Sequence, residues 1–216
     1  MDDARTAGAR TARRLPSGAL AGQRVVLATG NIGKQRELTA LLGPLGFELV
    51  LQTALNIESA EETGDTFQAN ALLKARHAAR LSGLPALADD SGIEVDALGG
   101  RPGVWSARYA GAGATDAANN AKLLAELADL PASRRTARYR CVIAFVADAD
   151  DPEPLLAEGA WEGRIGEAPR GAGGFGYDPL FWPQGLNVTA AEMPAAEKNA
   201  ISHRGLALTA LLAQLR

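Results

Sequence analysis

The stretch VVLATGNIGK, residues 25–34, decides the fold of this chain. Its first residues are apolar and partly β-branched, which predicts a buried strand that begins near Arg24. A turn with two glycines follows at residues 29–34. Beyond the turn, three leucines recur at helical spacing and predict a helix: Leu38, Leu41 and Leu42. A strand that runs through such a turn into a helix is typical of α/β proteins.

The remainder of the chain predicts further strands and helices. We expect strands at residues 47–51, 86–88, 93–97, 139–147 and 155–165, with the last two antiparallel to each other. We expect helices from the cap Thr66 to the stop signal Gly83, from Thr115 or Asp116 to Leu127, and at the end of the segment 197–215, after a loop. Strands and helices alternate early, and strands pair late. This order predicts an α/β or α+β fold with a mixed sheet.

The length of 216 residues favours one domain. Residues 1–22 carry four arginines among Ala, Gly and Thr and almost no large apolar side chain, so they cannot offset the entropy lost on ordering. We therefore predict a disordered extension at 1–22 and a single domain at 23–216. Because no apolar run approaches the roughly 20 residues that cross a bilayer, we predict no membrane partner.

The charge balance argues against nucleic acid as a partner. Lys and Arg number 22, Asp and Glu number 25, and the net charge is −3, whereas nucleic-acid-binding proteins show a basic excess. The single cysteine, Cys141, cannot form an internal disulfide and lies in the apolar run 141–146. We predict that it is a small buried side chain. A chain of this kind fits the reducing cytoplasm, which is its predicted location.

The turn at residues 29–34 has the features of an anion site. The N-terminus of the following helix offers free backbone N–H groups and a positive partial charge. Gly30 and Gly33 let a phosphate approach the backbone, Lys34 adds a positive charge, and Thr29 and Asn31 add hydrogen-bonding groups. The spacing differs from that of a Walker A loop. The alternative is an ordinary strand–helix turn that contains glycine.

Acidic residues gather in two further segments. Asp89 and Asp90 follow the expected strand 86–88, and Mg²⁺ in proteins takes carboxylates together with water and substrate phosphates. Their side chains point in opposite directions in an extended segment, so one of them can face a cleft while the other caps a turn. Glu61 or Glu62 is a candidate second ligand, close before a helix that carries Lys74. The alternative for each segment is a solvated polar turn.

Two segments near the C-terminus suit a flat base. Residues 173–181, GGFGYDPLF, place aromatic rings among glycines, and base stacking contributes about 1–3 kcal/mol per base. Asp178 is a candidate acceptor for a ring N–H. Residues 198–205, KNAISHRG, crowd hydrogen-bond donors for phosphate or carbonyl oxygens: Lys198, Ser202, His203 and Arg204. The alternative for the first segment is a turn with core aromatics.

The order and the amino-acid sequences of these motifs resemble those of the inosine/xanthosine triphosphate pyrophosphatase family. The matching stretches are 28–38, 61–75, 87–111, 173–181 and 197–205, and the resemblance covers residues 24–216. It implies an elongated mixed sheet with two lobes around a central cleft, in a homodimer. It also implies Mg²⁺-dependent hydrolysis of non-standard purine nucleoside triphosphates (ITP, dITP and XTP) to the monophosphate and pyrophosphate.

The resemblance also assigns roles to residues. Asp90 is the acidic centre, as metal ligand or general base, and Glu62 or Glu61 is a further metal ligand. Lys34 and Lys74 assist catalysis, and Ser91 and Lys74 line the phosphate path. The triphosphate is held by Thr29, Gly30, Asn31, Ile32, Gly33 and Lys34. The base is recognised by Phe175, Gly176, Tyr177, Asp178, Lys198, His203 and Arg204.

The chain departs from the family pattern at two positions. Relatives often carry Glu-Asn-Ala after the Thr-Phe pair, whereas Ala69 stands here in place of the Glu, and Trp105 replaces a more usual Tyr. If that acid binds metal in relatives, water or another ligand must replace it. Two other functions remain open at this point. One is a related pyrophosphatase for pyrimidine or modified nucleotides, and the other is a nucleotide-binding protein without catalysis.

Overall fold

A computed structural model describes residues 22–43 and 48–215. The predicted N-terminal extension, apart from Gly22, lies outside these residues, as does Phe47 of the predicted second strand. Six strands form one sheet in the order β2-β1-β3-β4-β5-β6. Their bounds are Arg24–Leu27 (β1), Glu48–Leu51 (β2), Ala86–Val95 (β3), Thr136–Val146 (β4), Leu155–Ile165 (β5) and Phe181–Pro183 (β6).

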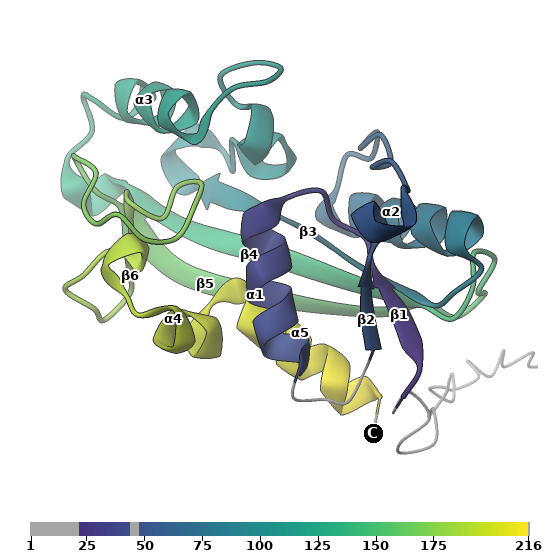
Figure 1. Cartoon of the computed structure of the whole chain (residues 1–216). Helices are drawn as coiled ribbons and strands as arrows, with labels where there is room; N and C mark the ends of the chain where they lie inside the picture. The colour runs from purple at the N-terminus through teal and green to yellow at the C-terminus, as the bar shows by residue number, and fades with distance from the viewer. Residues whose placement is uncertain (1–21, 44–47, 216) are drawn as a thin grey trace, which may run out of the picture.

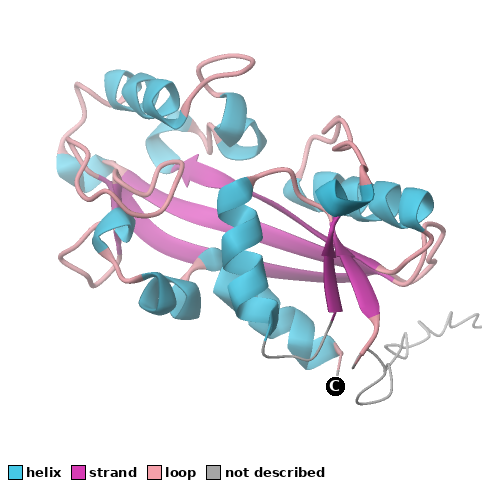
Figure 2. Cartoon of the chain, viewed as in Figure 1, coloured by secondary structure: helices cyan, strands magenta, loops and turns pink. Residues whose placement is uncertain are grey.

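The predicted mixed sheet is confirmed. Strand β1 is parallel to both β2 and β3, whereas β3, β4, β5 and β6 pair antiparallel in succession. The α-helices of the described residues are Ile32–Leu42 (α1), Phe67–Ser82 (α2), Asp116–Glu126 (α3), Ala195–Ile201 (α4) and His203–Gln214 (α5). Figures 1 and 2 show an elongated sheet with helices along it, α3 near one end and the short strands β1 and β2 near the other.

The helices cover the two faces of the sheet with separate apolar cores. On one face, Leu38 and Leu42 of α1 and Leu208 and Leu211 of α5 pack against strand residues such as Leu87. On the other face, the small alanine stripe of α2 packs against Ala86, Ala88 and Val142. Because side chains alternate along a strand, consecutive residues of β3 face different helices. This alternation later decides the roles of Asp89 and Asp90.

Helix ends agree with local capping signals. Thr66 accepts a hydrogen bond from the backbone N–H of Ala69 at 3.1 Å, and α2 ends at Gly83, whose φ of +68° suits glycine. Helix α1 begins at Ile32, earlier than the motif suggested, because the side chain of Asn31 accepts from the N–H of Lys34 at 3.0 Å and caps it. Thr115 caps α3 in the same way.

Two sequence expectations are wrong. Residues 86–97 were expected as two strands around a turn, but β3 is continuous through Asp89 and Asp90 because β4 pairs with it along its whole length. Neither acid therefore caps a turn. The start of the segment 197–215 was expected as a loop, whereas Glu197 to Ile201 belong to helix α4.

The sheet opens beside β3. Strand β1 pairs with β3 only at Val26 with Ala86 and Leu27 with Leu87. The chain then leaves the sheet and turns into α1, so the next residues of β3 keep β4 as a neighbour but lose β1. Ligands of α/β proteins commonly bind where neighbouring strands part in this way. The acids of β3 lie at this opening.

Candidate active site

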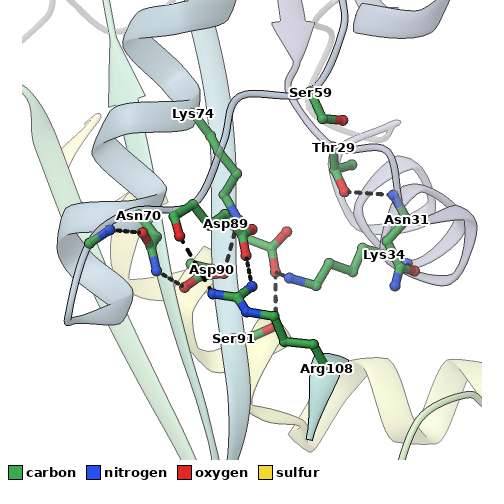
Figure 3. Close-up of polar contacts among 12 residues, drawn as sticks. Thr29, Asn31, Lys34, Ser59, Asn70, Lys74, Asp89, Asp90, Ser91 and Arg108 are labelled. Carbon is green, nitrogen blue, oxygen red and sulfur yellow. Dashed lines mark hydrogen bonds and ion pairs between the residues drawn. The ribbon is translucent and has the colours of Figure 1, made fainter. Parts of the chain in front are cut away.

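Asp89 and Asp90 face opposite sides of the sheet (Figure 3). Asp89 points toward α1 and α5, where its Oδ2 lies 3.2 Å from the Nζ of Lys34 and 3.2 Å from Arg204 Nη2. Asp90 points toward α2, where its Oδ1 lies 2.9 Å from the Nζ of Lys74. Asn70 donates to Asp90 Oδ2 at 3.2 Å. Each acid thus has its own set of partners.

The surroundings of the two carboxyl groups shift their pKa values in opposite directions. Burial by itself raises the pKa of Asp89, but the positive charges of Lys34 and Arg204 outweigh burial and hold this pKa well below its usual range. Burial raises the pKa of Asp90, and Lys74 offsets only part of that effect. Asp89 is therefore a permanently ionised counter-ion, whereas Asp90 is the acid of the pair better suited to accept a proton.

A further carboxylate, that of Glu62, shares the partner Lys74 with Asp90. Its Oε1 lies 2.6 Å from Lys74 Nζ, and its Oε2 lies 3.3 Å from Arg108 Nη1. Burial raises the pKa of Glu62, but the charge of Lys74 outweighs burial and lowers the pKa below its usual value. Glu61 is exposed and does not line the cleft. The structure thus brings Glu62 to Asp90 and leaves Glu61 outside.

The donor set fits a magnesium ion. Carboxylates of Glu62 and Asp90, from separate segments, converge on one positive charge, the ammonium of Lys74. No cluster of three or more Asp, Glu, His or Cys with ligand geometry occurs in residues 22–43 and 48–215. Mg²⁺ in phosphate-handling sites needs no more than one or two carboxylates, because water and substrate phosphates supply the other oxygens.

The turn before α1 forms one wall of the cleft. Thr29 Oγ1 accepts from the N–H of Asn31 at 3.2 Å. A Cβ atom on Gly30 would lie 2.8 Å from Ser59 Oγ, and one on Gly33 would lie 2.5 Å from the ring of Phe175, so a larger residue at either position must displace its neighbour. The side chain of Ile32 points away from this wall and is 64% exposed. Ile32 can therefore contribute only its backbone N–H.

A second hollow lies around the glycine-rich loop. Asp178 holds this loop: its carboxylate accepts from the backbone N–H of Phe175 at 2.9 Å and from the hydroxyl of Tyr139 at 3.2 Å. Burial raises the pKa of Asp178, and the charge of Lys198 opposes that effect. The N–H of Gly176 donates to Asp116 at 2.7 Å. Both carboxylate oxygens of Asp178 are thus engaged in building the loop.

His203 and Arg204 start α5 beside this hollow. The ring of His203 stacks on Tyr139 at 4.6 Å between centroids and an angle of 8°. Burial and the positive charges of Arg204 and Lys198 lower the pKa of His203 far below its usual value, so the ring is neutral. Its Nδ1 is buried and has no hydrogen-bond partner in the part of the chain that the structure describes.

The cations of this hollow are paired. Arg204 donates to Ser91 Oγ at 2.9 Å and to Asp89, and it also contacts Glu37. Lys198 lies 2.8 Å from Glu37 and also binds Asp178. Both Lys198 and Arg204 are buried. The donors that the sequence predicted are therefore held in place by carboxylates.

The two hollows form one cleft. The hollow beside Glu62, Lys74 and Asp90 has a volume of about 440 Å³, and the hollow around Phe175 has a volume of about 80 Å³. Four residues line both of them, and all four lie between the acids and the aromatic loop: Asn31, Lys34, Ser91 and Ala107. A ligand can therefore extend from the acids to the aromatic loop.

Sequence reasoning missed several residues that line this cleft or contact the residues lining it. Asn70 lies one helical turn before Lys74, and Glu37 lies one turn after Lys34, so helical spacing was the available signal for both. Arg108 and Tyr139 carried no local signal. Cys141 is buried as predicted, and burial raises the pKa of its thiol to about 12. No described helix is long and apolar enough to cross a membrane.

Comparisons with known proteins identify relatives over most of the chain. Over 194 residues, which are 90% of this chain, the sequence is 59% identical to the dITP/XTP pyrophosphatase of Methylococcus capsulatus and 56% identical to that of Escherichia coli strain K12, of which it covers 96% and 98%. A solved HAM1 protein of Coxiella burnetii is similar at a TM-score of 0.82 with 49% identity, covering 89% of this chain and 98% of that one.

A solved structure from Mycobacterium abscessus, described as a nucleoside-triphosphatase or dITP/XTP pyrophosphatase, is similar at a TM-score of 0.70 with 46% identity. It matches 89% of this chain and 100% of its own. The family model described as the Ham1 family matches residues 25–214, nearly all of the described structure. The chain therefore belongs to the Ham1 family.

Proposed function

We propose that this chain hydrolyses the non-standard purine nucleotides dITP, XTP and ITP to the nucleoside monophosphate and pyrophosphate, and so removes them from the nucleotide pool. The observation that carries the proposal is the continuous cleft, with two carboxylates and two lysines at one end and an aromatic, donor-rich hollow at the other. A triphosphate fits the charged end and a purine fits the aromatic end. The names of the relatives support this choice of substrates.

We assign Mg²⁺ to the carboxylates of Asp90 and Glu62. When bound, the ion neutralises phosphate charge and stabilises the charge that develops on the leaving pyrophosphate. Ala69 is exposed on α2 and does not line the cleft, so its missing carboxylate removes no donor from this pair.

The triphosphate lies against the N-terminus of α1 in this proposal. The backbone N–H groups of Ile32 and Gly33 and the ammonium of Lys34 face the phosphate oxygens, and Thr29, Asn31 and Ser91 add hydrogen bonds. Lys74 lies on the opposite side, between Asp90 and Glu62. Positive groups on both sides of the chain of phosphates stabilise the negative charge that moves onto the β-phosphate oxygen.

The chemical step is a displacement at the α-phosphorus. A water oxygen attacks the α-phosphorus, the bond to the bridging oxygen of the β-phosphate breaks, and pyrophosphate leaves. Asp90 accepts the proton of the attacking water, because its carboxylate borders the hollow that holds the phosphates in this proposal. Lys34 and Lys74 keep the phosphates aligned for this attack.

The base end selects purines with a 6-carbonyl group. Phe175 offers a ring for stacking, and the cations of Lys198 and Arg204 lie 5.1 and 5.8 Å from the centre of that ring. These donors favour the carbonyl oxygen of hypoxanthine and xanthine. The 6-amino group of adenine presents a donor to these cations in place of an acceptor, so adenine pairs less well with them.

We further propose that the protein is a cytoplasmic homodimer. The resemblance to the pyrophosphatase family supports the dimer, and the single buried thiol supports a reducing compartment. Light scattering of the full chain tests the dimer: a mass of one chain at micromolar concentration refutes it.

A substrate panel tests the activity. The purified chain is incubated with Mg²⁺ and equal concentrations of dITP, XTP, ITP, dATP, dGTP and the pyrimidine nucleotides, and pyrophosphate is detected. We expect the three non-standard purines to react fastest. Inorganic phosphate as first product refutes the pyrophosphatase, preference for a pyrimidine changes the substrate class, and binding without any product indicates a non-catalytic protein.

A further inference from the structure

The metal ligand Glu62 lies on a segment that has neither helix nor strand. Residues 57–64 connect a short helical turn at Gln52–Leu55 to α2 without backbone ladder pairing. Ligands on such loops are placed less precisely than ligands on helices and strands, so other side chains must orient them. Asp90, by contrast, lies on the central strand β3. Some group must therefore fix Glu62 relative to Asp90.

Arg108 has the contacts for this task. Its Nη1 lies 3.3 Å from Glu62 Oε2, and its Nη2 donates to the backbone carbonyl oxygen of the same residue at 3.4 Å. The guanidinium thus holds both the side chain and the main chain of Glu62. The other carboxylate oxygen, Oε1, faces Lys74 and Asp90. Arg108 thus binds one carboxylate oxygen and keeps the other directed at the ammonium of Lys74, the positive charge that Glu62 shares with Asp90.

Arg108 is itself anchored to the strand that carries Asp90. It ends the short helix Gly103–Arg108, and its guanidinium stacks over the ring of Trp105 at 4.4 Å. In the same helix, Ser106 accepts from the backbone N–H of Ile93 in β3 at 2.9 Å. Figure 3 shows Arg108 pointing toward the acidic group on this strand. The position of Glu62 is therefore tied, through Arg108, to β3.

We propose that Arg108 is a positioning residue that orients Glu62 toward Asp90 for binding of the divalent cation. The proposal rests on the assignment of the metal to Glu62 and Asp90. The sign of the change in cation affinity after removal of Arg108 tests this positioning role. The positive charge of Arg108 repels a divalent cation, so simple removal of that charge strengthens binding. Positioning of Glu62 predicts the opposite, a weaker site.

The experiment measures Mn²⁺ binding to the full chain without nucleotide, by the electron paramagnetic resonance signal of free Mn²⁺. The variants are Arg108→Ala, Arg108→Met, Arg108→Lys, Glu62→Gln and the double variant Arg108→Ala/Glu62→Gln. Arg108→Met keeps the side-chain stem over Trp105 and removes only the donors. Arg80→Ala is the matched control, because Arg80 pairs with Asp150 on the exposed surface.

We expect Arg108→Ala and Arg108→Met to weaken Mn²⁺ binding about 10- to 100-fold, the usual cost of removing a group that orients a metal ligand. Arg108→Lys recovers part of this loss, because one ammonium cannot serve the carboxylate and the carbonyl together. In the Glu62→Gln background, Arg108→Ala causes no further loss of Mn²⁺ affinity.

Unchanged or tighter Mn²⁺ binding by Arg108→Met overturns the positioning role, and so does an equal loss with and without Glu62. If Arg108→Ala does not fold, the Mn²⁺ affinity of Arg108→Met decides whether Arg108 positions Glu62. A wild-type chain that binds no Mn²⁺, or that hydrolyses dITP at full rate in chelator, refutes the metal site itself. The two failures are therefore distinguishable.

Discussion

The two ends of the cleft differ in the groups that surround their ion pairs. At the base end, the buried cations Lys198 and Arg204 share Glu37, and Arg204 also binds the fully buried Asp89. At the phosphate end, Lys34 borders the larger hollow, where the N-terminus of α1 offers backbone donors to an anion. Both ends hold ion pairs, since Lys34 contacts Asp89 and Lys74 contacts Glu62 and Asp90. The phosphate end adds the N-terminus of α1 to these pairs.

Adjacent residues of β3 belong to these different ends. Asp89 pairs with Arg204 at the base end and with Lys34 where the two hollows meet, whereas Asp90 pairs with Lys74 at the phosphate end. The alternation of side chains along a strand separates them. A carboxylate therefore stabilises the fold at Asp89, whereas the next carboxylate along the strand, Asp90, has the proposed catalytic role. Substitutions at the two positions should separate these roles.

The largest expected effect follows from removing the acid at each position. Asp90→Asn removes the proton acceptor and a metal ligand, so kcat for dITP falls by at least about 10²–10⁴-fold while the fold persists. Asp89→Asn leaves Arg204 and Lys34 without their buried counter-charge, and the free energy of unfolding falls by about 3–5 kcal/mol. Pyrophosphate release and urea unfolding measure the two effects.

Wild-type behaviour of either variant, Asp90→Asn or Asp89→Asn, would contradict the role given to that acid. If Asp90→Asn retains wild-type turnover, Asp90 is not the acidic centre. If Asp89→Asn unfolds at the same urea concentration as the wild-type chain, the buried network at the base end does not depend on it.

A substitution at the junction tests whether the two ends are coupled. Gly33 lies in the first turn of α1, at the proposed phosphate end, yet a Cβ atom there would lie 2.5 Å from the ring of Phe175 at the proposed base end. Gly33→Ala must displace the ring or the turn, and misplacement of about 1 Å can cost 10²-fold in rate. We expect kcat/KM for dITP to fall by about that factor.

Gly43→Ala is the control, because Gly43 ends the same helix and a Cβ atom there meets nothing within 4 Å. Equal kcat/KM for both alanine variants would mean that the ring moves freely and that the two ends are independent.

Local signals in the sequence predicted the helices well. The limits of α2 follow from Thr66 and Gly83, which act within one turn of the helix end. The continuity of β3 was missed because it depends on pairing with β4, and Asp89, for example, lies opposite Ile143. Propensity at a polar Asp-Asp-Ser-Gly stretch favours a turn, and the neighbouring strand overrides it.

In the site, too, residues with local signals were predicted and contacts between distant segments were missed. The motifs named most of the residues that line the cleft, because the residue types themselves carry the chemistry. The contacts that orient those residues were missed, since they join distant segments: Arg204 meets Asp89 across 115 positions, and Arg108 meets Glu62 across 46. No local pattern encodes such pairs. Only the folded chain brings them together.

The buried histidine of the base end predicts a dependence of stability on pH. Burial and neighbouring cations lower the pKa of His203 in the folded chain, whereas the unfolded value is about 6.5. Below that pH, the unfolded state binds a proton that the folded state excludes. The free energy of unfolding therefore falls as the pH drops below about 6.5, by up to about 1.4 kcal/mol per pH unit from this group.

Urea unfolding at several pH values between about 5 and 8 measures this effect in the wild-type chain and in His203→Gln. We expect the variant to lose less stability on acidification. His77 is present in both proteins and cancels in the difference. Parallel curves for the two proteins would show that His203 titrates normally and is not held neutral.

The smallest expected effect concerns Ala69, where the family resemblance predicted Glu. Ala69 is the third residue of α2, and its N–H already bonds the side chain of the cap Thr66 at 3.1 Å. A Glu there can accept from the N–H of Thr66 and complete a capping box. We expect Ala69→Glu to raise the free energy of unfolding by about 0.3–1 kcal/mol, helped by the helix dipole. Mn²⁺ affinity should stay unchanged, because the position is exposed and outside the cleft. Tighter Mn²⁺ binding by Ala69→Glu, with Ala69→Gln as the uncharged control, would instead make this carboxylate a metal ligand and move the metal toward the start of α2.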